Sequence, residues 1–174
     1  MAKIIRAYDF NGFYVLNGVK GSQAGEVMYY NNGAIFGKIE DDNKDSGGPP
    51  KTKKLFLGLH FPGDDSLAFI KIAHPSEFLW PVMWIMQSGH GRVDHGLSEK
   101  YSGHWVLAEG LPFIEGLEDL IAQENPCLFN IPGNVLRETY FPREILSRIK
   151  EHASMRGQTG ELVFKAKPLP HQSN

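Results

Sequence analysis

The sequence contains little cysteine, almost no net charge and no long apolar run, and each absence excludes a class of protein. Its 174 residues include one cysteine, Cys127, so neither an intrachain disulfide nor a zinc site built from several cysteines can form. The formal net charge is −2, from 18 basic and 20 acidic residues, which argues against sequence-independent binding of nucleic acid. The longest strongly apolar run, residues 78–86, contains Pro81 and is too short to span a bilayer.

The N-terminal segment also lacks the features of a secretion signal. Residues 1–9 place charged side chains within a short apolar stretch and contain no apolar core segment. Together with the missing membrane span, this predicts a cytoplasmic protein without a nucleic-acid or membrane partner. A chain of 174 residues with 41% apolar residues is the size of one domain that folds without disulfides, so we expect a single domain over residues 1–174.

Short apolar segments separated by turn-forming residues fill the first 110 positions, which is typical of antiparallel strands. Asn32-Gly33 between two such segments is the strongest hairpin signal, and Pro62 to Asp65 predicts a second hairpin. Residues 9–12 resemble a turn, and residues 40–54 a polar loop. Strands are expected within residues 13–16, 26–30, 34–39, 55–61, 67–72, 82–86 and 104–108.

Glycines inside the expected strands, at Gly37 and Gly58, indicate bends that curl the sheet. After residue 111 the pattern changes: apolar residues recur at helical spacing over 113–121 and again over 142–149, and residues 161–164 resemble a last strand. The predicted fold class is α+β, mostly antiparallel β: a coiled sheet or barrel of about eight strands with two C-terminal helices. The barrel-like meander would occupy 8–110, and the helical segment and final strand 111–174.

Aromatic residues and methionines are frequent on the expected strands. They either pack a solid core or line a cavity, because a barrel of about eight strands can enclose one small ligand. Both interpretations stay open at this stage. If there is a cavity, we expect Tyr14, Phe36, Trp84 and Trp105 to line it.

Gly12-Phe13-Tyr14 leads into the first long strand and is followed by a meander of hairpins. Over residues 8–110 this pattern resembles the calycin group, which comprises lipocalins, fatty-acid-binding proteins and avidin-like barrels; Tyr14 stands where lipocalins have tryptophan. The resemblance implies a barrel that binds a small apolar or aromatic molecule in its mouth, without a cofactor.

A histidine-rich stretch provides a second hypothesis. His90, Asp94, His95 and His104 fall within fifteen residues, and three histidines, or two and a carboxylate, can hold a catalytic zinc or iron ion with an open position. The alternative is a glycine-rich loop with solvated histidines. If the metal site forms, the protein is a metal-dependent enzyme. Neither a nucleophile elbow nor a phosphate-binding glycine loop is present in the sequence.

A third hypothesis is an accessory or assembly protein. The apolar positions Leu117 and Ile145 of the two expected helices would then face a protein partner or a second copy of the chain. The sequence thus predicts binding of an apolar or aromatic small molecule first, with a metal-dependent enzyme and an interaction protein as alternatives, and it leaves enzyme activity open.

Overall fold

The computed structural model describes residues 3–44, 51–61, 63, 65–73, 82–88, 98–107, 143–144, 146–148, 151 and 158–170. These residues form eight strands, which are β1 (Ile4–Leu16), β2 (Val19–Tyr30), β3 (Ala34–Asp42), β4 (Thr52–Phe61), β5 (Ser66–Ala73), β6 (Val82–Ser88), β7 (Ser98–Leu107) and β8 (Thr159–Lys167).

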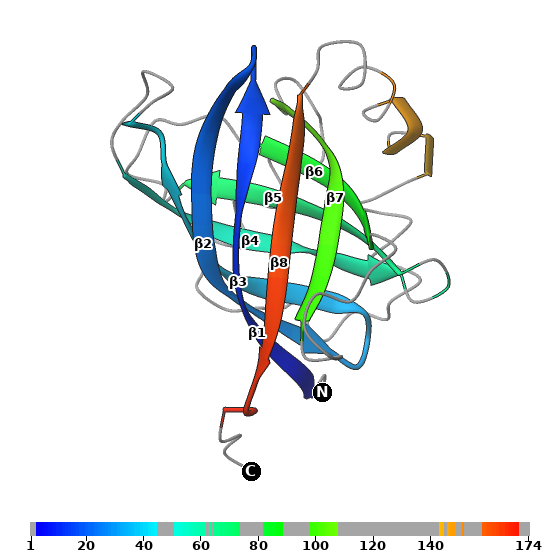
Figure 1. Cartoon of the computed structure of the whole chain (residues 1–174). Helices are drawn as coiled ribbons and strands as arrows, with labels where there is room; N and C mark the ends of the chain where they lie inside the picture. Colours follow the sequence, from blue (N-terminus) through cyan, green and yellow to red (C-terminus); the bar gives the residue numbers. More distant parts are fainter. Residues whose placement is uncertain are drawn as a thin grey trace.

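The strands form one closed barrel in the order of the chain (Figure 1). Every neighbouring pair is antiparallel, and β8 closes the barrel by pairing with both β1 and β7. The predicted mostly antiparallel barrel of about eight strands is therefore confirmed, and its last strand comes from the C-terminal third of the chain.

The helical part of the prediction is not confirmed in the form expected. The described residues contain one short helical stretch, within 143–151, rather than two C-terminal helices (Figure 1). It overlaps the second expected helix, whereas the first, over 113–121, lies outside the described residues. A helix this short gains little from its own hydrogen bonds, because helix formation must first overcome a costly nucleation step.

The predicted turn at residues 9–12 is wrong, because β1 runs straight through it. Phe10 enters the core, and Gly12 lies so close to β8 that a Cβ there would be 1.9 Å from the Glu161 carbonyl oxygen. The glycine therefore allows two strands of a tightly curved barrel to approach each other. Gly37 has the same role, as its place within a strand indicated, because a Cβ there would lie 1.9 Å from the Glu26 carbonyl oxygen.

The hairpin predicted at Asn32-Gly33 is confirmed between β2 and β3. Gly33 has a φ of 90°, and its N–H donates to the Tyr30 carbonyl oxygen at 3.0 Å. The turn in which both central residues have positive φ is the one between β1 and β2, where Asn17 and Gly18 have φ of 51° and 79°. Positive φ at both central residues is the mark of a type I′ turn, which suits the right-handed twist of the two strands that it joins.

Alternate residues of the strands point inward and form one buried apolar cluster, as the two-residue period of a strand requires. Aromatic rings supply much of it. Its members are Tyr8, Phe10, Tyr14, Val27, Tyr29, Ile35, Ile39, Phe56, Leu67, Phe69, Val82, Trp84, Met86, Tyr101, Trp105, Leu162 and Phe164.

Candidate functional site

A row of aromatic rings crosses the barrel interior and ends at one of its two openings. Phe69, Trp84 and Trp105 are successive cross-strand partners on β5, β6 and β7. Their ring centroids are 5.8 Å apart for Phe69 and Trp84 and 6.2 Å apart for the two indoles. Tyr14 meets Trp105 edge to face at 5.9 Å. Both predicted indoles thus face the interior, on neighbouring strands as expected.

The structure brings together three of the four residues predicted to line a cavity. Tyr14, Trp84 and Trp105 belong to the buried cluster. Phe36 does not: it is half-buried and lies on β3 between Ile35 and Gly37, so it points away from the face that carries Ile35 and Ile39.

The row reaches the barrel opening where β1 ends and β8 begins, at the top of Figure 1. Tyr14, Val82 and Trp105 keep 6–9% of their surface exposed, whereas Phe69 and Trp84, deeper in the barrel, keep none. We call this end of the barrel the Tyr14 end.

A buried ion pair lies at the Tyr14 end. Lys71 Nζ, on β5, lies 2.8 and 3.1 Å from the two carboxylate oxygens of Asp41, on β3. Lys54 Nζ, on β4, lies 3.4 Å from the same carboxylate. Asp41 is 2% exposed. The predicted polar loop over 40–54 is therefore wrong at both ends, because β3 continues to Asp42 and β4 begins at Thr52. The alternation of β3 turns Asp41 inward.

Aromatic rings also surround the buried ammonium group. Lys71 Nζ lies 5.3 Å from the ring centroid of Trp84 and 5.7 Å from that of Tyr14. Burial lowers the pKa of Lys71 to about 8; the Asp41 carboxylate opposes this change and the charge of Lys54 adds to it. The rings offer the cation a favourable quadrupole, but they do not replace the water it has lost.

Two polar side chains near this ion pair are buried without a hydrogen-bond partner in the described part of the chain. They are the Gln23 amide, through both its oxygen and its nitrogen, and the Trp84 indole N–H. Gln23 is 2% exposed and lies directly opposite Asp41 in the register of β2 and β3. Buried polar groups almost always have partners, so these orphaned groups require an explanation.

Further polar contacts line the same opening. The Tyr14 hydroxyl donates to the Asn43 side-chain oxygen, and the Asn43 amide nitrogen donates to the Thr52 hydroxyl oxygen at 3.4 Å. A ligand at the Tyr14 end would meet these groups beside the ion pair.

The opposite end of the interior is acidic and rich in hydrogen bonds. The Tyr101 hydroxyl donates to Asp65 at 2.8 Å and lies 3.1 Å from Glu99. The ring nitrogen Nε2 of His60 lies 2.8 Å from the same Asp65 oxygen. Burial is the main cause that raises the pKa of Tyr101. Two carboxylates therefore lie at this end, near the imidazole of His60 and the guanidinium of Arg6.

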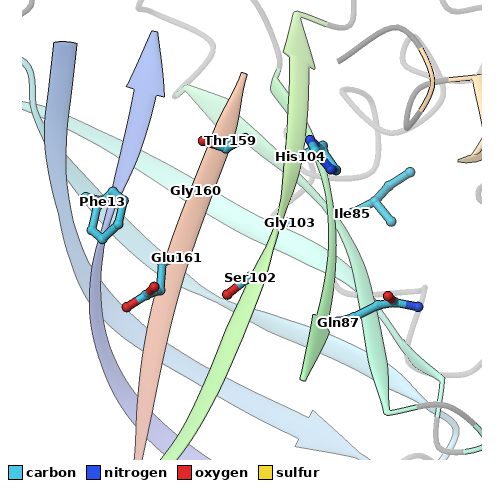
Figure 2. Close-up of a pocket in the computed structure, with 9 residues that line it drawn as sticks. All are labelled: Phe13, Ile85, Gln87, Ser102, Gly103, His104, Thr159, Gly160 and Glu161. Atoms are coloured by element: carbon cyan, nitrogen blue, oxygen red, sulfur yellow. The ribbon is translucent and has the colours of Figure 1, made fainter. Parts of the chain in front are cut away.

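A groove of about 370 Å³ lies on the outer wall of the barrel, across β1, β8, β7 and β6 (Figure 2). Figure 2 shows Phe13 on one side and Ile85 with His104 on the other, with Gly103 and Gly160 on the strands between them. Its remaining lining residues are polar, namely Gln87, Ser102, Thr159 and Glu161. The described residues enclose this groove only in part.

The predicted metal site falls mostly outside the described residues. His90, Asp94 and His95 lie there, whereas His104 lines the outer groove. Within the ranges that the structure describes, no three histidine, cysteine or acidic side chains are grouped to hold a metal ion. The metal hypothesis stays a prediction, as does the interaction face, since Leu117 and Ile145 are also outside the described residues.

Sequence reasoning missed the polar residues of the Tyr14 end. A signal for Lys71 was present: it follows Leu67 and Phe69 at two-residue spacing, and so shares their inward face. Asp41 follows Ile35 and Ile39 in the same way.

Comparison with family models, curated proteins and solved structures found no match for this chain. Among the residues that the structure places, no helix is long and apolar enough to cross a membrane.

Proposed function

We propose that this barrel binds a small, partly apolar molecule at its Tyr14 end, against Tyr14 and Trp105, the two rings of the aromatic row that keep exposed surface there. The observation that carries the proposal is the pair of orphaned polar groups, the Gln23 amide and the Trp84 indole N–H, at the end of an aromatic row. A ligand with apolar and polar parts is complementary to that combination, because small-molecule sites are mostly apolar with a few convergent polar groups.

A barrel interior that serves stability alone is the alternative, and the orphaned groups argue against it. Each buried group without a partner costs about 1–3 kcal/mol, and an apolar side chain in its place would avoid that cost. A ligand that supplies hydrogen-bond partners removes the same cost when it binds. Closed barrels of eight strands hold at most one small ligand, so the expected stoichiometry is one to one.

The resemblance to the calycin group belongs to this proposal. An eight-stranded barrel with strands in up-and-down order is the architecture of lipocalins. Support comes from the order of β1 to β8. The Gly12-Phe13-Tyr14 motif does not contribute, because it lies near the end of β1 instead of leading into the first strand. The expected ligand class, apolar or aromatic, is the one that the aromatic row favours.

The test is a titration with N-phenyl-1-naphthylamine, a neutral aromatic probe that becomes fluorescent in apolar surroundings. A Trp80→Phe background leaves Trp84 and Trp105 as the two tryptophans. We expect saturable, one-to-one binding, with energy transfer from the indoles to the probe.

Substitutions at two neighbouring residues show where the probe binds, because these residues lie on opposite faces of β1. Tyr14→Leu changes the interior end, and Phe13→Leu changes the outer groove, with similar apolar volume retained. Tyr14→Leu should weaken binding severalfold and Phe13→Leu should leave it unchanged. The reverse pattern would place the probe in the outer groove, and absence of saturable binding would remove the basis of the proposal.

A further inference from the structure

The charged groups at the Tyr14 end do not balance. Lys54, Lys71 and Asp41 share one cluster, and their side chains are 10%, 3% and 3% exposed. Among the residues that the structure describes, two ammonium groups therefore face one carboxylate, which leaves one positive charge in excess where the side chains are largely buried. A buried charge without a counter-charge is costly, so the cluster is complementary to an added negative charge.

The hydrogen-bonding groups show the same imbalance, because donors exceed acceptors. In the part of the chain that the structure describes, the amide nitrogen and oxygen of Gln23 and the indole N–H of Trp84 are buried and unpartnered, which is three N–H donors against one acceptor oxygen. Lys54 is bound to Asp41 through a single 3.4 Å contact, so its ammonium group keeps donor capacity. Several donors and one excess positive charge around one opening form a receptor for an oxyanion.

The other end of the barrel has the opposite character. Asp65 and Glu99 both lie within hydrogen-bonding distance of the Tyr101 hydroxyl, so the carboxylates there already share a donor. The described residues thus place two carboxylates at that end and two ammonium groups with one carboxylate at the Tyr14 end, which favours an anionic group at the Tyr14 end.

We propose that the ligand carries an oxyanion, a carboxylate, sulfonate or phosphate, that binds between Lys54 and Lys71 while its apolar part contacts Tyr14 and Trp105. This inference rests on the proposed function and adds the ligand's charge to it. The lowered pKa of Lys71 is in keeping with it, because a bound anion would replace part of the solvation that burial removes.

The experiment compares two probes that differ in one group. 8-Anilinonaphthalene-1-sulfonate has the ring system of N-phenyl-1-naphthylamine plus a sulfonate. We expect the anionic probe to bind the wild-type protein about tenfold or more tightly, because a hydrogen bond to a charged group of this kind is worth at least that ratio. Equal affinities would overturn the inference while leaving the proposed function intact, and no binding of either probe would overturn both.

Adjacent lysines on β4 supply a matched pair of variants. Lys54 is largely buried with Asp41, whereas Lys53 is exposed on the other face of the strand. Lys54→Met should lower the affinity for the anionic probe about tenfold and leave the neutral probe unaffected, and Lys53→Met should change neither. If Lys54→Met does not fold, Lys54→Gln serves instead. Loss of anionic-probe affinity in Lys53→Met, or its retention in the Lys54 variant, would contradict the assignment.

A competition experiment tests whether the ligand needs an apolar part, by comparing an apolar carboxylate with free inorganic phosphate. Decanoate, a carboxylate with an apolar chain, should displace the anionic probe at concentrations where inorganic phosphate does not. Displacement by phosphate at the same concentrations would show that an apolar part is not required, and would refute that half of the inference.

Discussion

Raising the pH above neutrality should stabilise the protein through one buried lysine. Burial lowers the pKa of Lys71 from 10.5 to about 8 in the folded chain, while an unfolded chain keeps the ordinary value. Between these two pH values the unfolded chain binds more protons than the folded one, so the free energy of unfolding increases with pH. A lysine whose pKa is raised on folding by a charged partner would have the opposite effect, because its contribution to stability would be lost as the pH rises.

The magnitude follows from the separation of the two values. They differ by about 2.5, and a difference of one corresponds to 1.36 kcal/mol, so the full effect is about 3 kcal/mol, of which about 1 kcal/mol develops between pH 7 and 9. Tyrosines oppose it at higher pH, because the pKa values of Tyr8, Tyr29 and Tyr101 are raised, mainly by burial. At high pH these tyrosines lose their protons more readily in the unfolded chain than in the folded one, which lowers the free energy of unfolding. Stability should therefore pass through a maximum at about pH 9 to 10.

Urea unfolding followed by tryptophan fluorescence at pH 7, 8, 9, 10 and 11 provides the assay. Lys71→Met removes the titrating group and keeps an apolar chain, so the increase should disappear while the decline above pH 10 remains. Asp41→Asn removes the attraction that holds the proton on Lys71, so the increase should begin at lower pH. Parallel curves for the wild type and Lys71→Met would refute the reasoning, and Asp41→Asn provides the test if Lys71→Met does not fold.

Three further substitutions test the packing of the barrel by urea unfolding. Phe69→Ala removes a fully buried ring stacked at 3.8 Å on its neighbour, and should cost about 3–5 kcal/mol; less than 1 kcal/mol would mean that the interior readily collapses around the gap. Gly37→Ala should cost about 1–3 kcal/mol because its Cβ would meet a backbone oxygen, whereas Gly63→Ala, with open space around it, should stay within about 0.5 kcal/mol of wild type. Equal effects of the two would contradict the close strand approach. Tyr101→Phe removes a hydroxyl bound to carboxylates and should cost about 1.5–3 kcal/mol; an unchanged midpoint would show that those bonds add nothing.

Strand positions were predictable because their signals are local. The hairpin at Gly33 follows from the conformational freedom that the turn requires of glycine, and the apolar alternation around Phe69 follows from the two faces of a strand. Strand ends were not predictable in the same way. Gly12 resembles a turn residue in the sequence, but in a closed barrel it allows β1 to lie against β8, a contact with a residue about 150 positions away.

The aromatic part of the candidate site was predictable, and its polar part was not. Trp84 and Trp105 are conspicuous as large residues on adjacent strands, and their pairing follows from the connection between those strands. Asp41 belongs to an acidic run that resembles a solvated loop when the chain is read alone. Its burial depends on β3 continuing past the apolar residues, and its charge is offset by lysines on the later strands β4 and β5.

Stability alone gives no reason for a lysine at position 71. Leu67 and Phe69 occupy the same inward face of β5 with almost no exposed surface, so the barrel readily accommodates apolar side chains there. Replacing a buried ion pair by packed apolar residues is often neutral or stabilising by about 1–4 kcal/mol. Lys54 also contacts Asp41, so this cluster of described side chains carries one positive charge more than it has carboxylates. The proposed anionic ligand would account for all three side chains at once, because it would balance the charge and give the unpaired donors beside it an acceptor.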